Sequence, residues 1–363
     1  MKKRSRVLSS ILALSLFLTA CGDIGSVENQ KSDSQKSENQ KESFKPYISI
    51  TYYKDKEEET EFPEYEDAIM YSYDIEEQKL EEKGALHIPD EAVDVGALYS
   101  KSNNKAYYSD LIITGRESSY TEIWEYDFET KEKVLLNKMD LESFELCNII
   151  GPNQLLGMSE SREHFENPAT FDVKSKKLSY LFEANNEENI YSFAPVSAQY
   201  NPGTGEIVCA YVNDEELRSE KVSSGDKSMP TYIAIASKSL VKDPKRIYML
   251  NLKGGDQVSY VTQISENECI AEVTHFVDSP EDIEDIYYDI KFNGDSAEAK
   301  KIDNIYPNSS GWKTIDGGKN YYFSLYKDNK TCLYCYNVES GKLNKIFEPE
   351  KGEYGWTIIG EIE

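Results

Sequence analysis

A turn motif that returns at a nearly constant spacing is the feature of this sequence that most restricts its fold. Each copy is rich in Asn, Gly or Pro and precedes a short apolar stretch. The copies lie at residues 102–105, 151–153, 201–205, 265–267 and 316–319. Counted from residue 103, they recur after 50, 50, 64 and 50 residues. Periods of about 40–50 residues are typical of β-propeller blades, so we expect a chain of repeated β units.

A second hairpin pattern alternates with the first. A strand ends in an aromatic or apolar residue, then Asp or Asn, then an apolar residue, and a polar turn leads into the next strand. Asp or Asn at this position can bond the backbone two residues further on. The copies are Tyr73-Asp74-Ile75, Tyr126-Asp127-Phe128, Phe171-Asp172-Val173, Leu250-Asn251-Leu252, Tyr288-Asp289-Ile290 and Tyr336-Asn337-Val338. Two alternating hairpins make a four-stranded blade, A-B-C-D, in which the first turn type joins A to B and the second joins C to D.

The two ends of the repeat region complement each other. The first unit begins at its strand B, over 48–53, and has no strand A before it. The chain ends on a lone strand, 355–360, which resembles the A strand at 311–315. If the C-terminal strand supplies the missing A strand, the ring closes without exposed sheet edges. Since Tyr is abundant and suits strands, we predict an all-β fold, a six-bladed β-propeller closed by the C-terminal strand.

The predicted blades differ in length. They are 48–89 with 354–363, 94–139, 145–184, 190–264, 266–303 and 308–350. The excess of the fourth, roughly 213–229, is polar and is interpreted as a surface loop between strands B and C, with a possible short helix in 214–224. The alternative is that 190–264 hides two units, which would give seven blades. The step of 64 residues contains one A–B turn, which favours six.

The A–B turns resemble the repeat signature of TolB-type propellers. The best copy is Thr314-Ile315-Asp316-Gly317-Gly318-Lys319 before Tyr321-Tyr322-Phe323, and Asn201-Pro202-Gly203-Thr204-Gly205-Glu206-Ile207 is a looser one. The resemblance implies a TolB-like six-bladed propeller. It implies no activity, because propellers include enzymes and scaffolds alike.

The N-terminus has the features of a secretion signal. Basic residues at positions 2, 3, 4 and 6 precede an apolar stretch, 7–19, which is too short to span a bilayer. Leu18-Thr19-Ala20-Cys21 resembles the lipobox of bacterial lipoproteins. That resemblance implies cleavage before Cys21 and a diacylglycerol on its thiol. We therefore expect a lipid-anchored protein of the cell membrane that faces outside the cytoplasm.

Composition divides the chain and limits its partners. Residues 1–20 are the predicted lipoprotein signal peptide, 21–46 the lipidated Cys and a disordered polar tether, and 47–363 the β-propeller domain. The net charge is −26, and removal of the signal leaves 36 basic and 66 acidic residues, or −30. Such a surface disfavours nucleic acid. The expected partners are the membrane, through the lipid, and an envelope protein, peptide or glycan.

No catalytic or metal-binding pattern stands out in the sequence. The three histidines, His87, His164 and His275, lack partners at metal-ligand spacing. Cys332 and Cys335 form a C-x-x-C on a predicted strand, where positions i and i+3 point to opposite faces. Cys147, Cys209 and Cys269 are interpreted as structural thiols. We predict no metal, no cofactor and no catalytic residues.

Two tryptophans are the candidate ligand-binding residues. Trp312 and Trp356 open the A strands of neighbouring blades, nearest the axis. There they would form an aromatic floor for a sugar or peptide. The alternative is that both side chains pack between blades. The expected function is binding of a protein, peptide or glycan by a tethered propeller. One alternative is a hydrolase or lyase that acts on glycans through carboxylates in the central funnel. Another is a structural part of an envelope complex.

Overall fold

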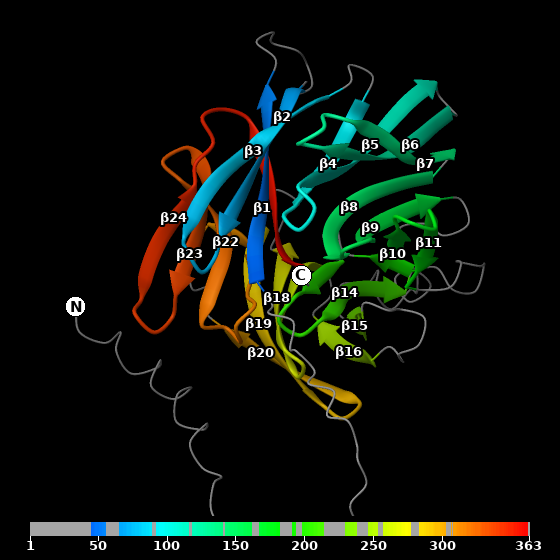
Figure 1. Cartoon of the computed structure of the whole chain (residues 1–363). Coiled ribbons are helices and arrows are strands. Elements are labelled where there is room, and N and C mark those ends of the chain that lie inside the picture. Colours follow the sequence, from blue (N-terminus) through cyan, green and yellow to red (C-terminus); the bar gives the residue numbers. More distant parts are fainter. Residues whose placement is uncertain are drawn as a thin grey trace, which may run out of the picture. The chain divides into compact units, whose positions relative to one another are not determined.

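The recurring turns separate strands that pair in six antiparallel sheets, one for each predicted blade (Figure 1). The computed structural model describes residues 45–55, 65–88, 92–115, 118–140, 142–161, 167–181, 191–193, 198–213, 229–237, 246–252, 257–276, 283–302, 306 and 308–361. All regular elements within these ranges are strands. The predictions for the signal, Cys21, most of the tether, His164 and 214–224 concern residues outside them.

The first three sheets contain the strands up to Tyr180 together with the C-terminal strand. The first has the order β25 (Glu353–Glu361), β1 (Lys45–Asp55), β2 (Tyr65–Asp74) and β3 (Lys79–His87). The second contains β4 (Ala92–Ser100), β5 (Lys105–Gly115), β6 (Ser118–Asp127) and β7 (Lys133–Asp140). The third contains β8 (Glu142–Gly151), β9 (Gln154–Ser161), β10 (Asn167–Asp172) and β11 (Lys177–Tyr180).

The other three sheets complete the ring. The fourth contains β12 (Tyr191–Phe193), β13 (Gln199–Asn201), β14 (Glu206–Asn213), β15 (Met229–Ser237) and β16 (Arg246–Leu252), with β12 and β13 both paired to β14. The fifth contains β17 (Gln257–Ser265), β18 (Glu268–Phe276), β19 (Ile283–Asn293) and β20 (Ser296–Ile302). The sixth contains β21 (Ser309–Lys313), β22 (Asn320–Lys327), β23 (Lys330–Asn337) and β24 (Lys342–Phe347).

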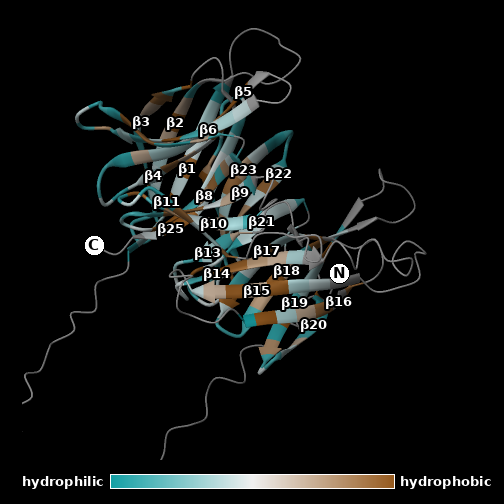
Figure 2. Ribbon diagram, turned by 90° about the vertical axis from the view of Figure 1, so that its right-hand side faces the viewer, coloured by the Kyte–Doolittle hydropathy of each residue, from teal (hydrophilic) through white to brown (hydrophobic). Residues whose placement is uncertain are grey.

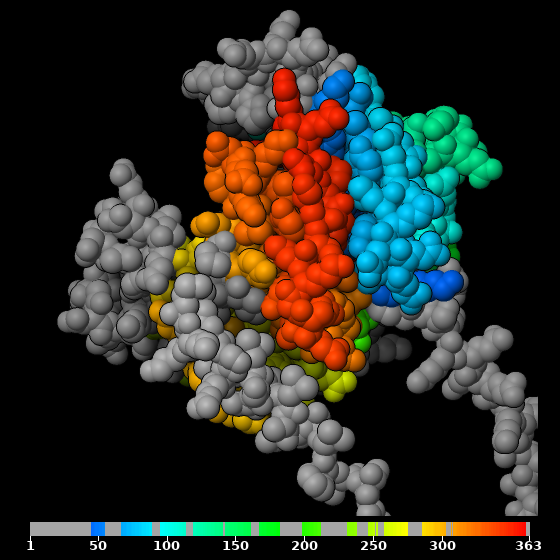
Figure 3. Space-filling view, turned by 90° about the vertical axis from the view of Figure 1, so that its left-hand side faces the viewer, coloured from blue at the N-terminus to red at the C-terminus, as the bar shows by residue number. Residues whose placement is uncertain are grey.

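The C-terminal strand closes the propeller as predicted. β25 pairs with β1 from Lys45↔Glu361 to Tyr53↔Glu353 and takes the place of the missing A strand. In Figure 3 the red C-terminal residues lie between the orange strands of blade six and the blue strands of blade one. The prediction of an all-β, six-bladed propeller is therefore confirmed, and the seven-bladed alternative is wrong.

One predicted blade boundary is wrong. The predicted fourth blade, 190–264, includes β17, but β17 pairs with β18 and is the A strand of the fifth blade. The triplet Leu250-Asn251-Leu252 ends β16 and leads to the next blade, not to a C–D hairpin. The error arose because Gly254-Gly255 offers turn residues that suit either kind of connection, and only strand pairing distinguishes them.

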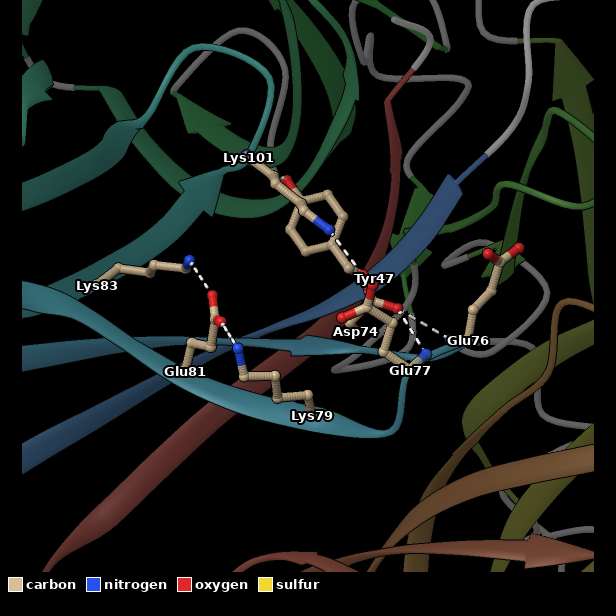
Figure 4. A network of polar contacts seen from close by, with 8 residues as sticks. All are labelled: Tyr47, Asp74, Glu76, Glu77, Lys79, Glu81, Lys83 and Lys101. Atoms are coloured by element: carbon tan, nitrogen blue, oxygen red, sulfur yellow. Dashed lines mark hydrogen bonds and ion pairs between the residues drawn. The ribbon is translucent and has the colours of Figure 1, made fainter.

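Four of the six predicted Asp and Asn positions, 74, 127, 172 and 337, organise C–D turns. Asp74, the last residue of β2, accepts bonds at 3.0 Å from the backbone N–H groups of Glu76 and Glu77 (Figure 4). The N–H of Glu77, followed by the ammonium of Lys101 at 2.8 Å, holds the pKa of Asp74 below its usual value. Asp127 caps its turn in the same way. These local bonds explain why the hairpins could be recognised in the sequence.

Hydrophobic clusters lie between neighbouring blades. One joins blades one, two and three through side chains such as Met70, Tyr108 and Phe171. Another joins blades four and five through Ile235 and Val273. Figure 2 shows the corresponding concentration of hydrophobic residues along strands such as β14 and β15. Each sheet thus buries both faces, as blades in a ring require.

The connections lie at two opposite ends of the sheets, because neighbouring strands run antiparallel. The A–B and C–D connections share one end, here called the turn end. The B–C and blade-to-blade connections share the other, here called the loop end. Since Lys45 pairs with Glu361, β1 begins and β25 finishes at the turn end.

Candidate functional site

The propeller axis is crossed by contacts between blades that are not neighbours. β8 of blade three lies against β25 of blade one. Asn148 Nδ2 donates to Thr357 Oγ1 at 3.0 Å and to the carbonyl oxygen of Ile358 at 3.1 Å. From blade six, Lys313 Nζ donates to the same Thr357 Oγ1 at 3.1 Å. Thr357 therefore links three blades at the axis.

A small cavity lies beside this junction, between blades four, five, six and one. Its volume is about 20 Å³, and a buried water needs about 10–15 Å³ on the same measure. The cavity therefore has room for about one water. Its polar lining consists of Gln199, Asn201, Thr262, Gln263, Lys313 and Thr314.

Lys313 is the most unusual group of this lining. Burial lowers the pKa of its amine to about 7, and the neighbouring Cys147 opposes that shift. Its Nζ lies 4.6 Å from the centre of the Trp356 ring and donates to the Trp356 carbonyl oxygen at 3.2 Å. Among the described residues, no carboxylate forms a salt bridge with it. The side chain keeps some accessible surface, and it lines this cavity; burial is the largest cause of the lowered pKa.

Cys147 is held as a thiol. Burial, and then the charge of Glu145, raise its pKa to about 12, against smaller opposing effects from a backbone bond and Lys313. Its Sγ is 3.5 Å from the carbonyl oxygen of Glu145. A thiol of this kind is a poor nucleophile, so the amine of Lys313 is the reactive group of the pair.

Glu272 is a second group whose pKa lies near neutrality. Burial, reinforced by Asp285, raises the pKa of its carboxyl to about 7, while a bond from the backbone N–H of Gly311 opposes the shift. Its Oε2 is buried without a partner. Glu272 also interacts electrostatically with Tyr260, which burial keeps protonated by raising its pKa well above the usual value. Clustered groups with shifted pKa values are candidates for a functional site.

The two predicted tryptophans have different surroundings. Trp312 is 3% exposed, stacks on Phe323 with ring centres 4.5 Å apart, and donates from Nε1 to Ser309 Oγ at 3.0 Å. Trp356 is partly buried below Lys313 and donates to Ser324 Oγ at 3.0 Å. Trp312 thus packs between blades, whereas Trp356 borders the axial site. A ligand-binding role for either stays a prediction.

The cysteines and histidines show no site among the described residues. Cys209, Cys269 and Cys332 are buried cysteines, and Cys335 is a partly buried cysteine on the same strand as Cys332. The described residues hold no group of three His, Cys, Asp or Glu suited to a metal ion. They also include no helix with the length and apolar character that a membrane span requires.

Comparisons with known proteins find only low structural likenesses. No family model matches the chain, and no curated protein matches it either. TolB from Acinetobacter baumannii is similar, with a TM-score of 0.46 and 10% identity over 85% of this chain and 66% of TolB. A nidogen/laminin complex is similar with a TM-score of 0.45 and 13% identity, over 86% of this chain and 98% of the matched chain. The acylaminoacyl peptidase of Pyrococcus horikoshii is similar with a TM-score of 0.42 and 15% identity, over 82% of this chain and 44% of the peptidase. Likenesses this low carry no argument, so the fold assignment depends on the strand pairing alone.

Proposed function

We propose that the chain is an extracytoplasmic lipoprotein, held to a membrane by lipid on Cys21, whose propeller binds a partner at its loop end. The carrying observation is the place where the chain enters the domain. β1 begins at Lys45, at the turn end, beside the last strand. A tether attached there leaves the loop end free to meet a partner.

Charge supports the same orientation. By sequence, the connections of the loop end contain 26 Asp and Glu against 8 Lys and Arg. The connections of the turn end contain 9 Asp and Glu against 8 Lys and Arg. An acidic end is repelled by nucleic acid and anionic lipid and attracts basic surfaces. The proposed partner is therefore a basic segment of an envelope protein or peptide.

The axis favours binding over glycan cleavage in a funnel. A glycosidase needs two carboxylates about 5–10 Å apart with a sugar between them. The axial cavity has a volume of about 20 Å³, which is too small for a sugar ring. Glu272 lies at the interface of blades five and six, where the backbone N–H of Gly311 bonds it.

The anchor is tested by fractionation. A variant carrying Cys21→Ser behind an ordinary cleavable signal peptide should appear as a folded, soluble protein, because lipid is the proposed membrane attachment. The unaltered chain should sediment with membranes and be extracted only by detergent. A variant that stays with membranes after a high-salt wash would contradict the single lipid anchor.

The binding end is tested with poly-L-lysine as the probe, measured by calorimetry at low salt. Replacing the three glutamates at 57–59, which lie in sequence between β1 and β2, with Gln should weaken binding several-fold. The matched control replaces Glu76, Glu77 and Glu129, three exposed glutamates of the turn end, and should change binding much less. Equal losses in both variants would sink the assignment of the loop end while leaving the anchor unaffected.

A further inference from the structure

The axial cavity holds an amine in a setting that the partner-binding function does not explain. We propose that Lys313 is a nucleophilic site on the propeller axis that takes small aldehydes as a reversible Schiff base. This inference is independent of the proposed partner and of the membrane anchor.

The position of the amine supports the proposal. Two acceptors, the carbonyl oxygen of Trp356 and the hydroxyl of Thr357, hold Nζ at 3.2 and 3.1 Å. A neutral amine donates its two hydrogens to the carbonyl oxygen and to the hydroxyl oxygen of Thr357, and a protonated amine donates to the same two acceptors. The neutral form is left with its lone pair, and the protonated form with its third N–H, for the cavity that Lys313 lines. The amine is therefore fixed in place and aimed at a space that a small molecule can enter.

The charge state of the amine also fits. A lysine amine reacts with carbonyl carbon only when it is neutral, and an exposed one has a pKa near 10.4. Burial lowers the pKa of the Lys313 amine to about 7. A large fraction of this amine is therefore neutral at physiological pH. The titratable neighbours, Cys147 on β8 and beyond it Tyr260 on β17, are held protonated at that pH. Desolvated lysines of this kind are the ones that form Schiff bases in proteins.

The size of the cavity limits the ligand. With room for about one water, it accepts an aldehyde of one or two carbons, because the new bond draws the carbon within bonding distance of Nζ. In the reaction the amine lone pair adds to the carbonyl carbon, and the carbonyl oxygen takes a proton to give a carbinolamine. That oxygen then leaves with both amine protons as water, and a C=N bond remains. One water is released per aldehyde, and no electrons are transferred.

The alternative occupant is a small anion held by the ammonium form. The net charge of −26 makes the protein surface repel anions. The lining also offers no second positive charge. We therefore favour the neutral electrophile and treat the anion as an outcome of the test.

The experiment uses ¹³C-formaldehyde with sodium cyanoborohydride, which reduces the imine to a stable methylamine. The protein is labelled briefly over a range of pH, cut with a glutamate-specific protease, and mapped by mass spectrometry. Lys319, an exposed lysine of the same hairpin, is the internal reference. We expect label at Lys313 to exceed that at Lys319 more than tenfold at pH 7, with a half-maximal rate near pH 7. Benzaldehyde should label Lys319 and spare Lys313.

Three controls decide the result. In guanidinium chloride the two lysines should be labelled equally, since the difference belongs to the folded site. Lys313→Met should lose the dominant label, and the measurements on the unaltered chain hold even if this variant folds poorly. The proposal is overturned if Lys313 is labelled no faster than Lys319 in the native protein. It is also overturned if added chloride suppresses the label at Lys313 alone, which would identify an ammonium site for anions.

Discussion

Two buried carboxylates differ from the many solvated acids of this chain. Asp110 is 1% exposed and neither of its oxygens has a partner. Glu272 is 8% exposed and one of its oxygens has none. Desolvation raises the pKa of Asp110 to about 6 and that of Glu272 to about 7. Folding therefore raises the proton affinity of both carboxyl groups.

Glu272 should make the domain less stable as pH rises towards 7. The pKa of Glu272 in the folded protein lies above the usual 4.5. Its contribution to the free energy of unfolding is therefore fully present below pH 4.5 and is lost as pH rises through about 7. Glu272→Gln should remove that loss, about 2–3 kcal/mol, and so stabilise the protein more at pH 8 than at pH 5. Urea unfolding at the two pH values measures it. Equal effects at both, or an equal response of the exposed control Glu132→Gln, would contradict the assignment.

The axial site could be predicted only in part from the sequence. The pattern drew attention to Trp312 and Trp356, which open equivalent strands. The reactive group is Lys313, the residue after Trp312, where the equivalent residue after Trp356 is Thr357. A lysine on an innermost strand was a usable signal. Its meaning depends on β8 and β25 meeting across the axis, and no local pattern encodes such a contact.

At the level of elements, local bonds decided which features the sequence revealed. Asp74 and Asp127 end their strands and bond the turns that follow, so their spacing predicted the hairpins. Asp289 lies inside β19, which continues to Asn293, and there the same triplet marks no strand end. The boundary between blades four and five was missed for a related reason, since it depends on which strand β17 pairs with.

The closing strand can be tested by deletion. Removal of residues 353–363 would expose the edge of β1 and uncover Ile48 and Ile50, which are fully buried. We expect the loss to exceed the total stability of a typical domain, about 5–15 kcal/mol, and to give aggregated or unfolded protein. Size-exclusion chromatography and circular dichroism report it. Deletion of 362–363 alone should leave both signals unchanged, and a monomeric, folded 1–352 chain would refute the role of β25.

For the whole molecule, charge opposes compactness. A net charge of −26 produces repulsion that salt screens, with a Debye length of about 8 Å at physiological ionic strength. The asymmetry between the ends means that the loop end should account for most of this effect. The domain is therefore predicted to be most sensitive to salt through that end.

Salt should stabilise the domain measurably. Between about 10 mM and 300 mM NaCl, we expect the urea midpoint to rise. The rise should shrink when the glutamates at 57–59 become Gln and should persist when Glu76, Glu77 and Glu129 are replaced. A midpoint that falls with salt would indicate that attractive ion pairs, such as Lys101 with Asp74 at 2.8 Å, outweigh the repulsion.

The pairing of β1 on both sides has a mechanical consequence. If the anchor is as proposed, any pull from the membrane enters at Lys45 and acts along a strand bonded to β25 and to β2. Force in that direction shears both ladders at once and does not peel them one bond at a time. The tether would then extend to its full length before the domain yielded, and a partner could drag on the propeller without opening it.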